Sequence, residues 1–247
     1  MSRTARRTNG LQASGDMSSA ASTRLEGFSD AVFALCATLL ILTLEVPRTY
    51  EDLVYIAQGF APFGLSFAML IFIWHEHHMF FKRYPLVDTW IVIFNSALLF
   101  VVLFYVYPLQ LLARLLASAL GLIDSPASAI LMHTDGRGLY VIYFLGAVAV
   151  FLCLALLYLR AFAQRDRLQL GVLETFQAKW HAQTYLIVVA VTFVSLLLAL
   201  LGIGLSFGLP GWASLAVAPL VAWHSHRFSA REEELKRSAD TRVWRRT

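Results

Sequence analysis

One stretch of the chain, from Trp180 to His226, contains no Asp, Glu, Lys or Arg. A membrane helix needs about 20 apolar residues to cross the hydrocarbon core, so this stretch is too long for a single crossing. Glycine and proline gather between Gly202 and Gly211, where they interrupt the helical pattern and favour a turn. The sequence therefore predicts two consecutive membrane helices joined by a hairpin.

Four more apolar segments precede this hairpin, and charged residues or proline bound each of them. The chain is 58% hydrophobic and only 15% charged, a composition typical of polytopic membrane proteins. We therefore expect an all-α membrane protein with six transmembrane helices. The first four are expected over 24–44, 53–81, 88–119 and 139–161, with a kink at Pro108.

Basic residues divide unevenly between the two sides of this six-helix topology. All but three of the 20 Lys and Arg residues fall in the tails and in the loops after the second and fourth helices. Because basic residues concentrate on the cytoplasmic side, both termini are expected there. Topology thus accounts for the net charge of +4, and no nucleic-acid partner is expected. The predicted parts are a disordered tail over 1–23, a transmembrane domain over 24–228 and a charged tail over 229–247.

Polar and charged side chains mark the start of the first apolar segment. Arg24, Phe28, Ser29 and Asp30 precede a charge-free run that is too short to span unless Ser29 and Asp30 also enter the membrane. An ionisable residue at that depth is costly and usually faces a partner or a water-filled cavity. The first helix is therefore expected to lie inside a helix bundle.

One face of this helix carries Leu35, Thr38, Leu39 and Leu42 at helical spacing. A hydroxyl among leucines on a shielded face suits a hydrophobic constriction that ions cross. The alternative is that the leucines pack against neighbouring helices while Thr38 bonds to its own backbone. The residues alone leave both interpretations open.

Several helices are expected to deliver polar groups to the cytoplasmic side. These groups would form a hydrogen-bonded network that anchors the first helix, in which Asp30 accepts from Arg24 or from a histidine. The alternative is that Trp and His simply collect at the membrane–water boundary. The residues concerned are Trp74, His75, His77 and His78 in the second helix, Asn95 in the third, and His224 and His226 in the sixth.

The histidines also raise two rival classes of function. His75 and His78 lie one helical turn apart, and imidazoles at this spacing can bind a transition metal in a membrane metalloenzyme. Such chemistry needs more ligands than this run supplies, so we expect no enzyme, no metal and no other cofactor. A secondary transporter would typically carry paired repeats and broken helices, and no internal repeat is evident.

The sequence contains no Thr-Val-Gly-Tyr-Gly filter loop and no arginine-repeat voltage sensor. Any ion channel built from this chain would therefore select ions by its side chains and its pore width. Its selectivity is expected to be modest.

The pattern Arg24-x-x-x-Phe28-Ser29-Asp30, at the entry of a first membrane helix, resembles the signature of the transmembrane protein 175 family. These proteins are potassium channels of lysosomes and of bacteria and archaea. The resemblance continues over 31–40 and extends, less specifically, to Trp74 and the histidines that follow it. It implies an integral membrane protein of the prokaryotic plasma membrane. It also implies a homotetramer in membrane lipid, because one first helix per chain cannot enclose a potassium pore.

The resemblance further implies roles for four residues of the first helix. Leu35 falls where the family places an aliphatic constriction, and Leu39 and Leu42 fall where prokaryotic members add further aliphatic layers. Thr38 matches a threonine associated with potassium preference. The animal members carry two copies of a six-helix unit, and this chain has length for one.

Overall fold

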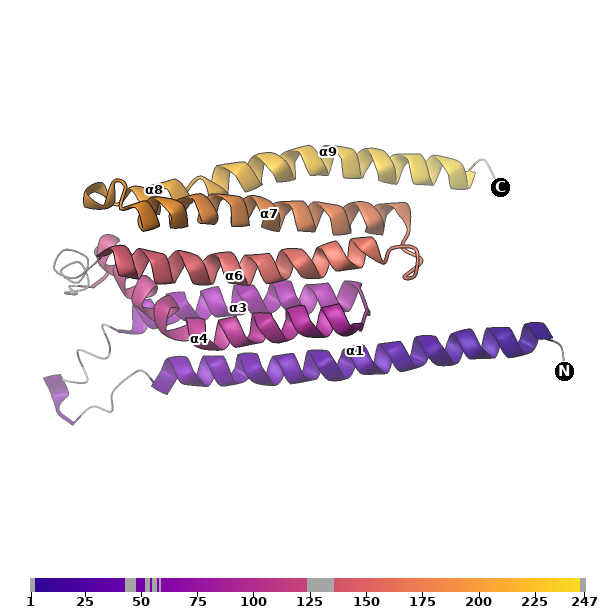
Figure 1. The fold of residues 1–247 in the computed structure, drawn as a ribbon, viewed down its shortest axis with the longest axis horizontal. Helices are drawn as coiled ribbons and strands as arrows, with labels where there is room; N and C mark the ends of the chain where they lie inside the picture. The colour runs from indigo at the N-terminus through magenta and orange to yellow at the C-terminus, as the bar shows by residue number, and fades with distance from the viewer. Residues whose placement is uncertain are drawn as a thin grey trace. The chain divides into compact units, whose positions relative to one another are not determined.

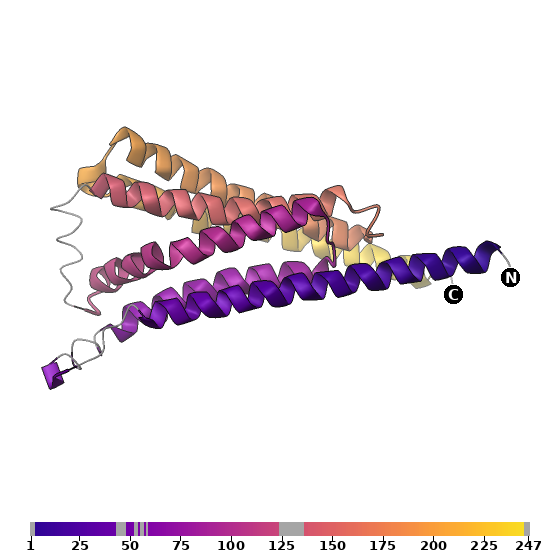
Figure 2. The same cartoon turned by 60° about the horizontal axis from the view of Figure 1, so that its bottom comes forward.

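The computed structural model describes residues 3–42, 48–51, 54, 57, 59–123 and 136–244, and every regular element within them is a helix. The prediction of an all-α protein is therefore confirmed. The chain divides into two compact units, Met1–Leu131 and Met132–Thr247. Figures 1 and 2 show that long helices make up both units.

Among its described residues, the first unit contains three long helices, α1 (Arg3–Leu42), α3 (Phe60–Arg83) and α4 (Thr89–Ala119). Each of them packs against the other two, and Figure 2 shows α1 alongside α3. Helix α4 starts where the sequence predicts, because the Asp88 carboxylate accepts the N–H of Ile91 at 2.9 Å and caps the first turn. The part of the second predicted helix before Phe60 lies mostly outside the described residues.

Helix α1 is longer than the sequence analysis expects. It begins at Arg3 and continues without a break through most of the segment expected to be a disordered tail, 1–23. Alanine and arginine are frequent in this segment, and both favour helix. Extending an existing helix also costs less than starting a new one, so the membrane helix supports its own polar extension.

A stripe of α1 forms the part of the helix that faces the core of the first unit. Its residues recur at helical spacing and are at most 4% exposed, so the other two helices cover this face. The stripe consists of Ser29, Phe33, Cys36 and Leu40. Leu70, Phe80, Ile91 and Leu98 of α3 and α4 are equally well buried.

The second unit contains α6 (Gly136–Ala163), α7 (Val172–Leu201), the short helices η1 (Leu205–Phe207) and α8 (Leu209–Ser214), and α9 (Val217–Trp244). Helix α7 packs against α6, α8 and α9. The predicted turn after α7 is present, with Gly202, Gly204 and Gly208 all in the left-handed region.

Four of the described helical segments are long and apolar enough to cross a membrane, namely Ala20–Leu42, Thr89–Ser118, Gly136–Ala163 and Val172–Leu201. The second and sixth predicted spans differ. Helix α3 ends in a run of histidine and charged residues, and α9 is mostly the charged tail. The sixth span is also broken between α8 and α9, because Pro219 has no N–H to donate to the carbonyl of Leu215. These two crossings stay predictions.

Candidate functional site

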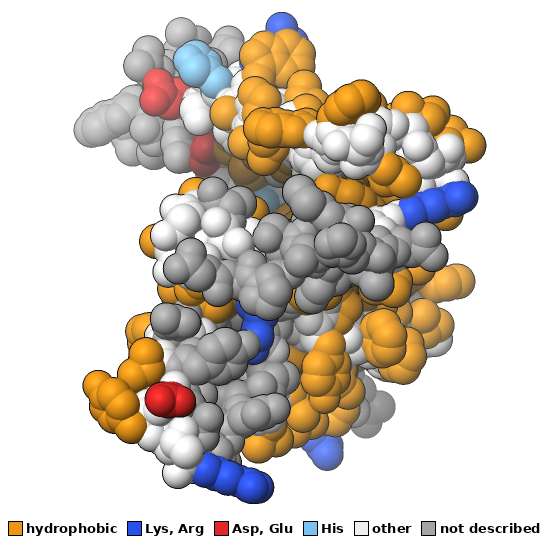
Figure 3. Space-filling view, turned by 90° about the vertical axis from the view of Figure 1, so that its left-hand side faces the viewer, with side chains coloured by type: hydrophobic (Ala, Val, Ile, Leu, Met, Phe, Trp, Pro, Cys, Tyr) orange, Lys and Arg blue, Asp and Glu red, His pale blue; other side chains and the backbone are white. Residues whose placement is uncertain are grey.

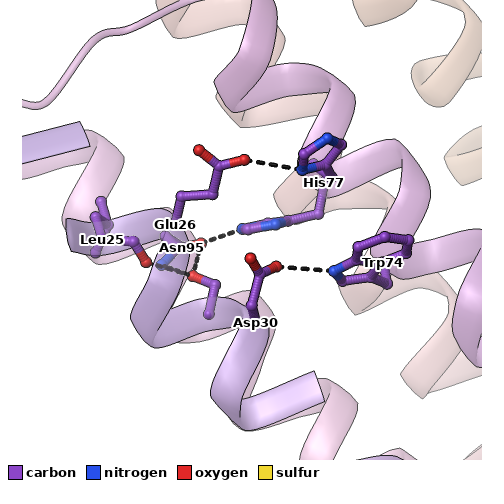
Figure 4. A network of polar contacts seen from close by, with 8 residues as sticks. Leu25, Glu26, Asp30, Trp74, His77 and Asn95 are labelled. Carbon is purple, nitrogen blue, oxygen red and sulfur yellow. Dashed lines mark hydrogen bonds and ion pairs between the residues drawn. The ribbon is translucent and has the colours of Figure 1, made fainter. Parts of the chain in front are cut away.

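A buried polar chain joins all three helices of the first unit. His77 of α3, Asn95 of α4 and Ser29 of α1 are each 0% exposed. His77 Nε2 lies 2.6 Å from Asn95 Oδ1, and the Asn95 amide donates to Ser29 Oγ at 3.0 Å (Figure 4). The Ser29 hydroxyl in turn donates to the carbonyl of Leu25 at 2.9 Å.

This chain of hydrogen bonds has one consistent direction. An amide oxygen can only accept, so His77 must donate through Nε2, and each following group then accepts one bond and donates the next. The His77 ring is also packed between Phe33 and Phe81, at centroid distances of 5.5 and 4.9 Å. His77 Nδ1 is buried without a hydrogen-bond partner among the described residues, but the other members of the chain are paired. Because unpaired buried polar groups are costly, these hydrogen bonds favour one axial position and one rotation of the three helices relative to each other.

Two further contacts link α1 to α3 at the edge of this buried chain. Trp74 Nε1 donates to Asp30 Oδ1 at 2.8 Å, and His78 Nδ1 lies 2.8 Å from Glu26 Oε1. Glu26 and Asp30 are four residues apart on α1, as Trp74 and His78 are on α3, so the two contacts lie side by side on facing helices. The Trp74 and His78 rings stack at 5.5 Å. The two helices are therefore joined over a full turn.

The structure brings together six residues of the predicted network: Ser29, Asp30, Trp74, His77, His78 and Asn95. The sequence predicts Arg24 or a histidine as the donor to Asp30, whereas the donor in the structure is Trp74. Arg24 is exposed, because six residues of helix place it on a different face of α1 from Asp30. Phe28 is also exposed, and neither side chain joins the network in the described part of the chain.

The sequence predicts no partner for Glu26. The signal that could have found it is its four-residue separation from Asp30, which matches the separation of Trp74 and His78. When two possible acceptors on one helix and two possible donors on an antiparallel helix have the same four-residue separation, two adjacent contacts between the helices can form. Periodicity could not have shown that α3 supplies both partners.

The histidine side chains near the end of α3 point in different directions. His77 contacts Asn95, His78 contacts Glu26, and His75 is exposed. Successive residues of a helix point about 100° apart, so neighbours in this run cannot converge on one ion. Among the described residues, no group of three or more His, Cys, Asp or Glu side chains is placed to hold a metal.

The predicted constriction stripe lies on the opposite face of α1 from the buried stripe. Leu35 is 50% and Leu42 is 71% exposed, while Leu39 is partly covered. Thr38 is exposed as well, and its hydroxyl donates to the carbonyl of Ala34 at 3.0 Å. One face of α1 is thus fastened to its own chain, and the other is left open.

Residues 24–105 match the model of a protein family described as the endosomal/lysosomal potassium channel TMEM175. A protein of Marivirga tractuosa called a potassium channel is 40% identical over 185 residues, which are 72% of this chain and 75% of that protein. The chain belongs to the TMEM175 family. A potassium channel of Chamaesiphon minutus is 28% identical over 194 residues, covering 71% of this chain and 86% of that protein.

A solved structure shares the fold of this TMEM175-family chain. It is the crystal structure of a variant of the potassium channel MtTMEM175 in complex with a nanobody–MBP fusion protein. The two are 34% identical, with a TM-score of 0.73 over 84% of this chain and 93% of that one. The family match over 24–105 contains both the polar network and the open stripe of α1. Together with the four apolar helices, family membership identifies an integral membrane protein.

Proposed function

We propose that this chain forms a potassium channel whose pore is lined by α1. One observation carries the proposal: α1 is anchored on one face by the buried polar chain, and its opposite face is apolar and open. An exposed apolar face on an anchored helix is expected to contact another protein chain or membrane lipid, or to line a pathway. The relatives with the same fold are called potassium channels, which favours an ion pathway over lipid at this face.

A single α1 cannot enclose a pathway, so copies of the chain must contribute equivalent helices. We propose a homotetramer, in which four copies of α1 surround one axis and the open stripe faces that axis. Arg24 and Phe28 are exposed in one chain and lie on the same side of α1 as this stripe. They are proposed to contact a neighbouring copy rather than Asp30 of their own chain.

The open stripe would then form rings around the axis. Leu35, Leu39 and Leu42 are proposed to make hydrophobic collars, where a narrow passage loses water easily and ions must shed or rearrange their hydration. Thr38 lies between them. Because its proton is committed to Ala34, the oxygen lone pairs are left for a passing cation. Four such oxygens would replace part of the hydration of potassium, with modest selectivity and without a carbonyl filter.

The polar network is proposed to hold this pore helix in place. The contacts of Asp30 and Glu26 with α3, and of Ser29 with α4, fix α1 against both of its neighbours. Both termini are proposed to be cytoplasmic, in a prokaryotic plasma membrane. Potassium is the permeant ion, and the proposal requires no cofactor, metal or nucleic acid.

Recording from purified protein in planar bilayers under a KCl gradient tests this proposal. We expect unitary currents whose reversal potential is shifted from zero toward the equilibrium potential of potassium. The rival class, a secondary transporter, would instead give slow flux that saturates with potassium and shows no unitary steps. Bilayers that receive detergent and lipid without protein are the control, and saturable flux alone would contradict the proposal.

A further inference from the structure

The turn between α7 and α8 depends on glycine. Gly202, Gly204 and Gly208 adopt φ angles of 72°, 66° and 67°, which other residues rarely adopt. A Cβ atom on Gly204 would lie 2.6 Å from the Cβ of Leu209, so only glycine fits there. The path of the chain through this turn therefore requires glycine at Gly204.

Those side chains are apolar and exposed. Phe207 is 78%, Leu201 69% and Trp212 68% exposed, and no residue over 201–222 is charged. Figure 3 looks onto this end of the molecule, and hydrophobic side chains cover much of its upper part, where η1 and α8 lie. Loops in contact with water are usually polar, so an apolar cluster of this kind marks a binding surface or a membrane.

A guanidinium lies beside this cluster. Arg137, in the first turn of α6, donates to the carbonyl of Leu200 at the end of α7 and is itself exposed. One hydrogen bond leaves further N–H donors of the guanidinium for another acceptor. Three residues later, the Tyr140 hydroxyl lies 3.4 Å from where a Cβ on Gly208 would be. The cation and the apolar turn therefore sit next to each other within one unit.

The length of α7 sets the depth of this end. Its 30 residues rise about 45 Å, which matches the thickness of a bilayer with its headgroups. At the other end of the unit, the Arg227 guanidinium lies 4.0 Å from the centroid of the Trp223 ring. Aromatic rings with basic residues are typical of membrane–water boundaries. A helix of this length that crosses a bilayer places both of its ends at headgroup level.

We propose that Arg137 and the turn after α7 form a phospholipid-binding surface. The Arg137 guanidinium binds the lipid phosphate, and Phe207 and Trp212 insert among the adjoining acyl chains. Charge complementarity selects the ligand, because a guanidinium pairs with a phosphate through two parallel hydrogen bonds. An uncharged aromatic surface beside that cation matches lipid rather than a water-soluble partner. The surface does not depend on whether α1 conducts ions.

Spin labelling in phospholipid vesicles tests the insertion. A label is placed at Phe207→Cys in a background where both natural cysteines, Cys36 and Cys153, are replaced by alanine. The control label is at Asp166→Cys, in the 89% exposed position of the loop between α6 and α7. We expect oxygen, which concentrates in the bilayer, to accelerate the spin relaxation of the label at 207 strongly, and a water-soluble nickel chelate to accelerate it little. The control label should show the reverse. Nickel access at 207 equal to the control, or shielding from both reagents, would overturn the proposal.

Native mass spectrometry tests the phosphate contact. Protein is purified from vesicles of phosphatidylglycerol and phosphatidylethanolamine, and bound lipids are counted per chain. Arg137→Gln should retain one lipid fewer than the wild type, whereas Arg137→Lys keeps the charge and should retain it. Adding inorganic phosphate should not displace the lipid. Equal lipid counts in the wild type and in Arg137→Gln, at equal elution on size exclusion, would contradict the phosphate contact.

Discussion

Trp74 Nε1 and Asp30 Oδ1 lie 2.8 Å apart, and this hydrogen bond joins α3 to α1, the helix proposed to line the pore. It gives the Asp30 carboxylate a neutral donor, although charged Arg24 is on the same helix. The consequence is that α1 is held by its own chain on the face that carries Asp30. The face that carries Leu35 is exposed, and in the proposed tetramer it would meet other copies of the chain.

Trp74→Phe removes the indole N–H and keeps an aromatic ring over His78. We expect a loss of about 2 kcal/mol in the free energy of unfolding, the size typical of a hydrogen bond to a charged group. The melting temperature of the detergent-purified protein should fall. Trp90→Phe is the control, because Trp90 is 53% exposed and should tolerate the change. Equal melting temperatures for the two variants would show that the Asp30 contact contributes nothing.

Ser29 and Asn95 should behave as one unit in a double-mutant cycle. Either Ser29→Ala or Asn95→Ala leaves a buried polar partner unpaired, at a cost of about 1–3 kcal/mol each. Making both changes removes donor and acceptor together, so the double variant should lose less stability than the two single losses added. Chemical unfolding of all four proteins measures the difference. Strict additivity would mean that the 3.0 Å contact is not formed in solution.

The contact between Glu26 and His78 should contribute little to stability. Both side chains are partly exposed, at 22% and 34%, and exposed pairs are typically worth less than about 1 kcal/mol. Glu26→Gln should therefore lower the melting temperature less than Trp74→Phe does, although the two contacts are one helical turn apart. A larger effect for Glu26→Gln would reverse this order of importance.

Local signals in the sequence predicted much of this fold, and contacts between distant residues account for what they missed. Asp88 predicts the start of α4 because a capping carboxylate acts within one turn. The faces of α1 follow from helical periodicity. By contrast, Ser29 and Asn95 are 66 residues apart, and only the packing of α1 on α4 brings them together.

Two other differences from expectation have local causes that the overall pattern concealed. Pro219 breaks the sixth span into α8 and α9, yet the surrounding run is uncharged and suggests one helix. Arg24 and Asp30 belong to one motif, but they are six residues apart, so their side chains lie on different faces of α1. A motif shows which residues matter, whereas the helix geometry decides which of them can touch.

Leu35→Ala should raise ion flux and weaken discrimination between potassium and sodium. A shorter side chain widens the proposed collar and lowers the barrier to wetting. Leu40→Ala is a matched control, because Leu40 is fully buried on the opposite face. It should cost about 2–5 kcal/mol of stability and leave permeation through assembled protein unchanged. Vesicle flux assays of both variants decide which face of α1 meets the ions.

Thr38→Val replaces the hydroxyl by a methyl group while fold and assembly persist. If the Thr38 oxygen faces the ion pathway, potassium loses a ligand that partly replaces its water, and preference over sodium should fall. If the hydroxyl serves only its bond to Ala34, permeation should not change. Size exclusion verifies that both proteins assemble alike.

The bi-ionic reversal potential, with potassium on one side of a planar bilayer and sodium on the other, tests most directly whether α1 lines a potassium pathway. The wild-type reversal potential should make the potassium side negative relative to the sodium side, which indicates potassium preference. Thr38→Val should move this potential toward zero. Leu40→Ala, on the buried face, should leave it unmoved. A wild-type potential at zero, or one that Thr38→Val does not shift, would contradict the account.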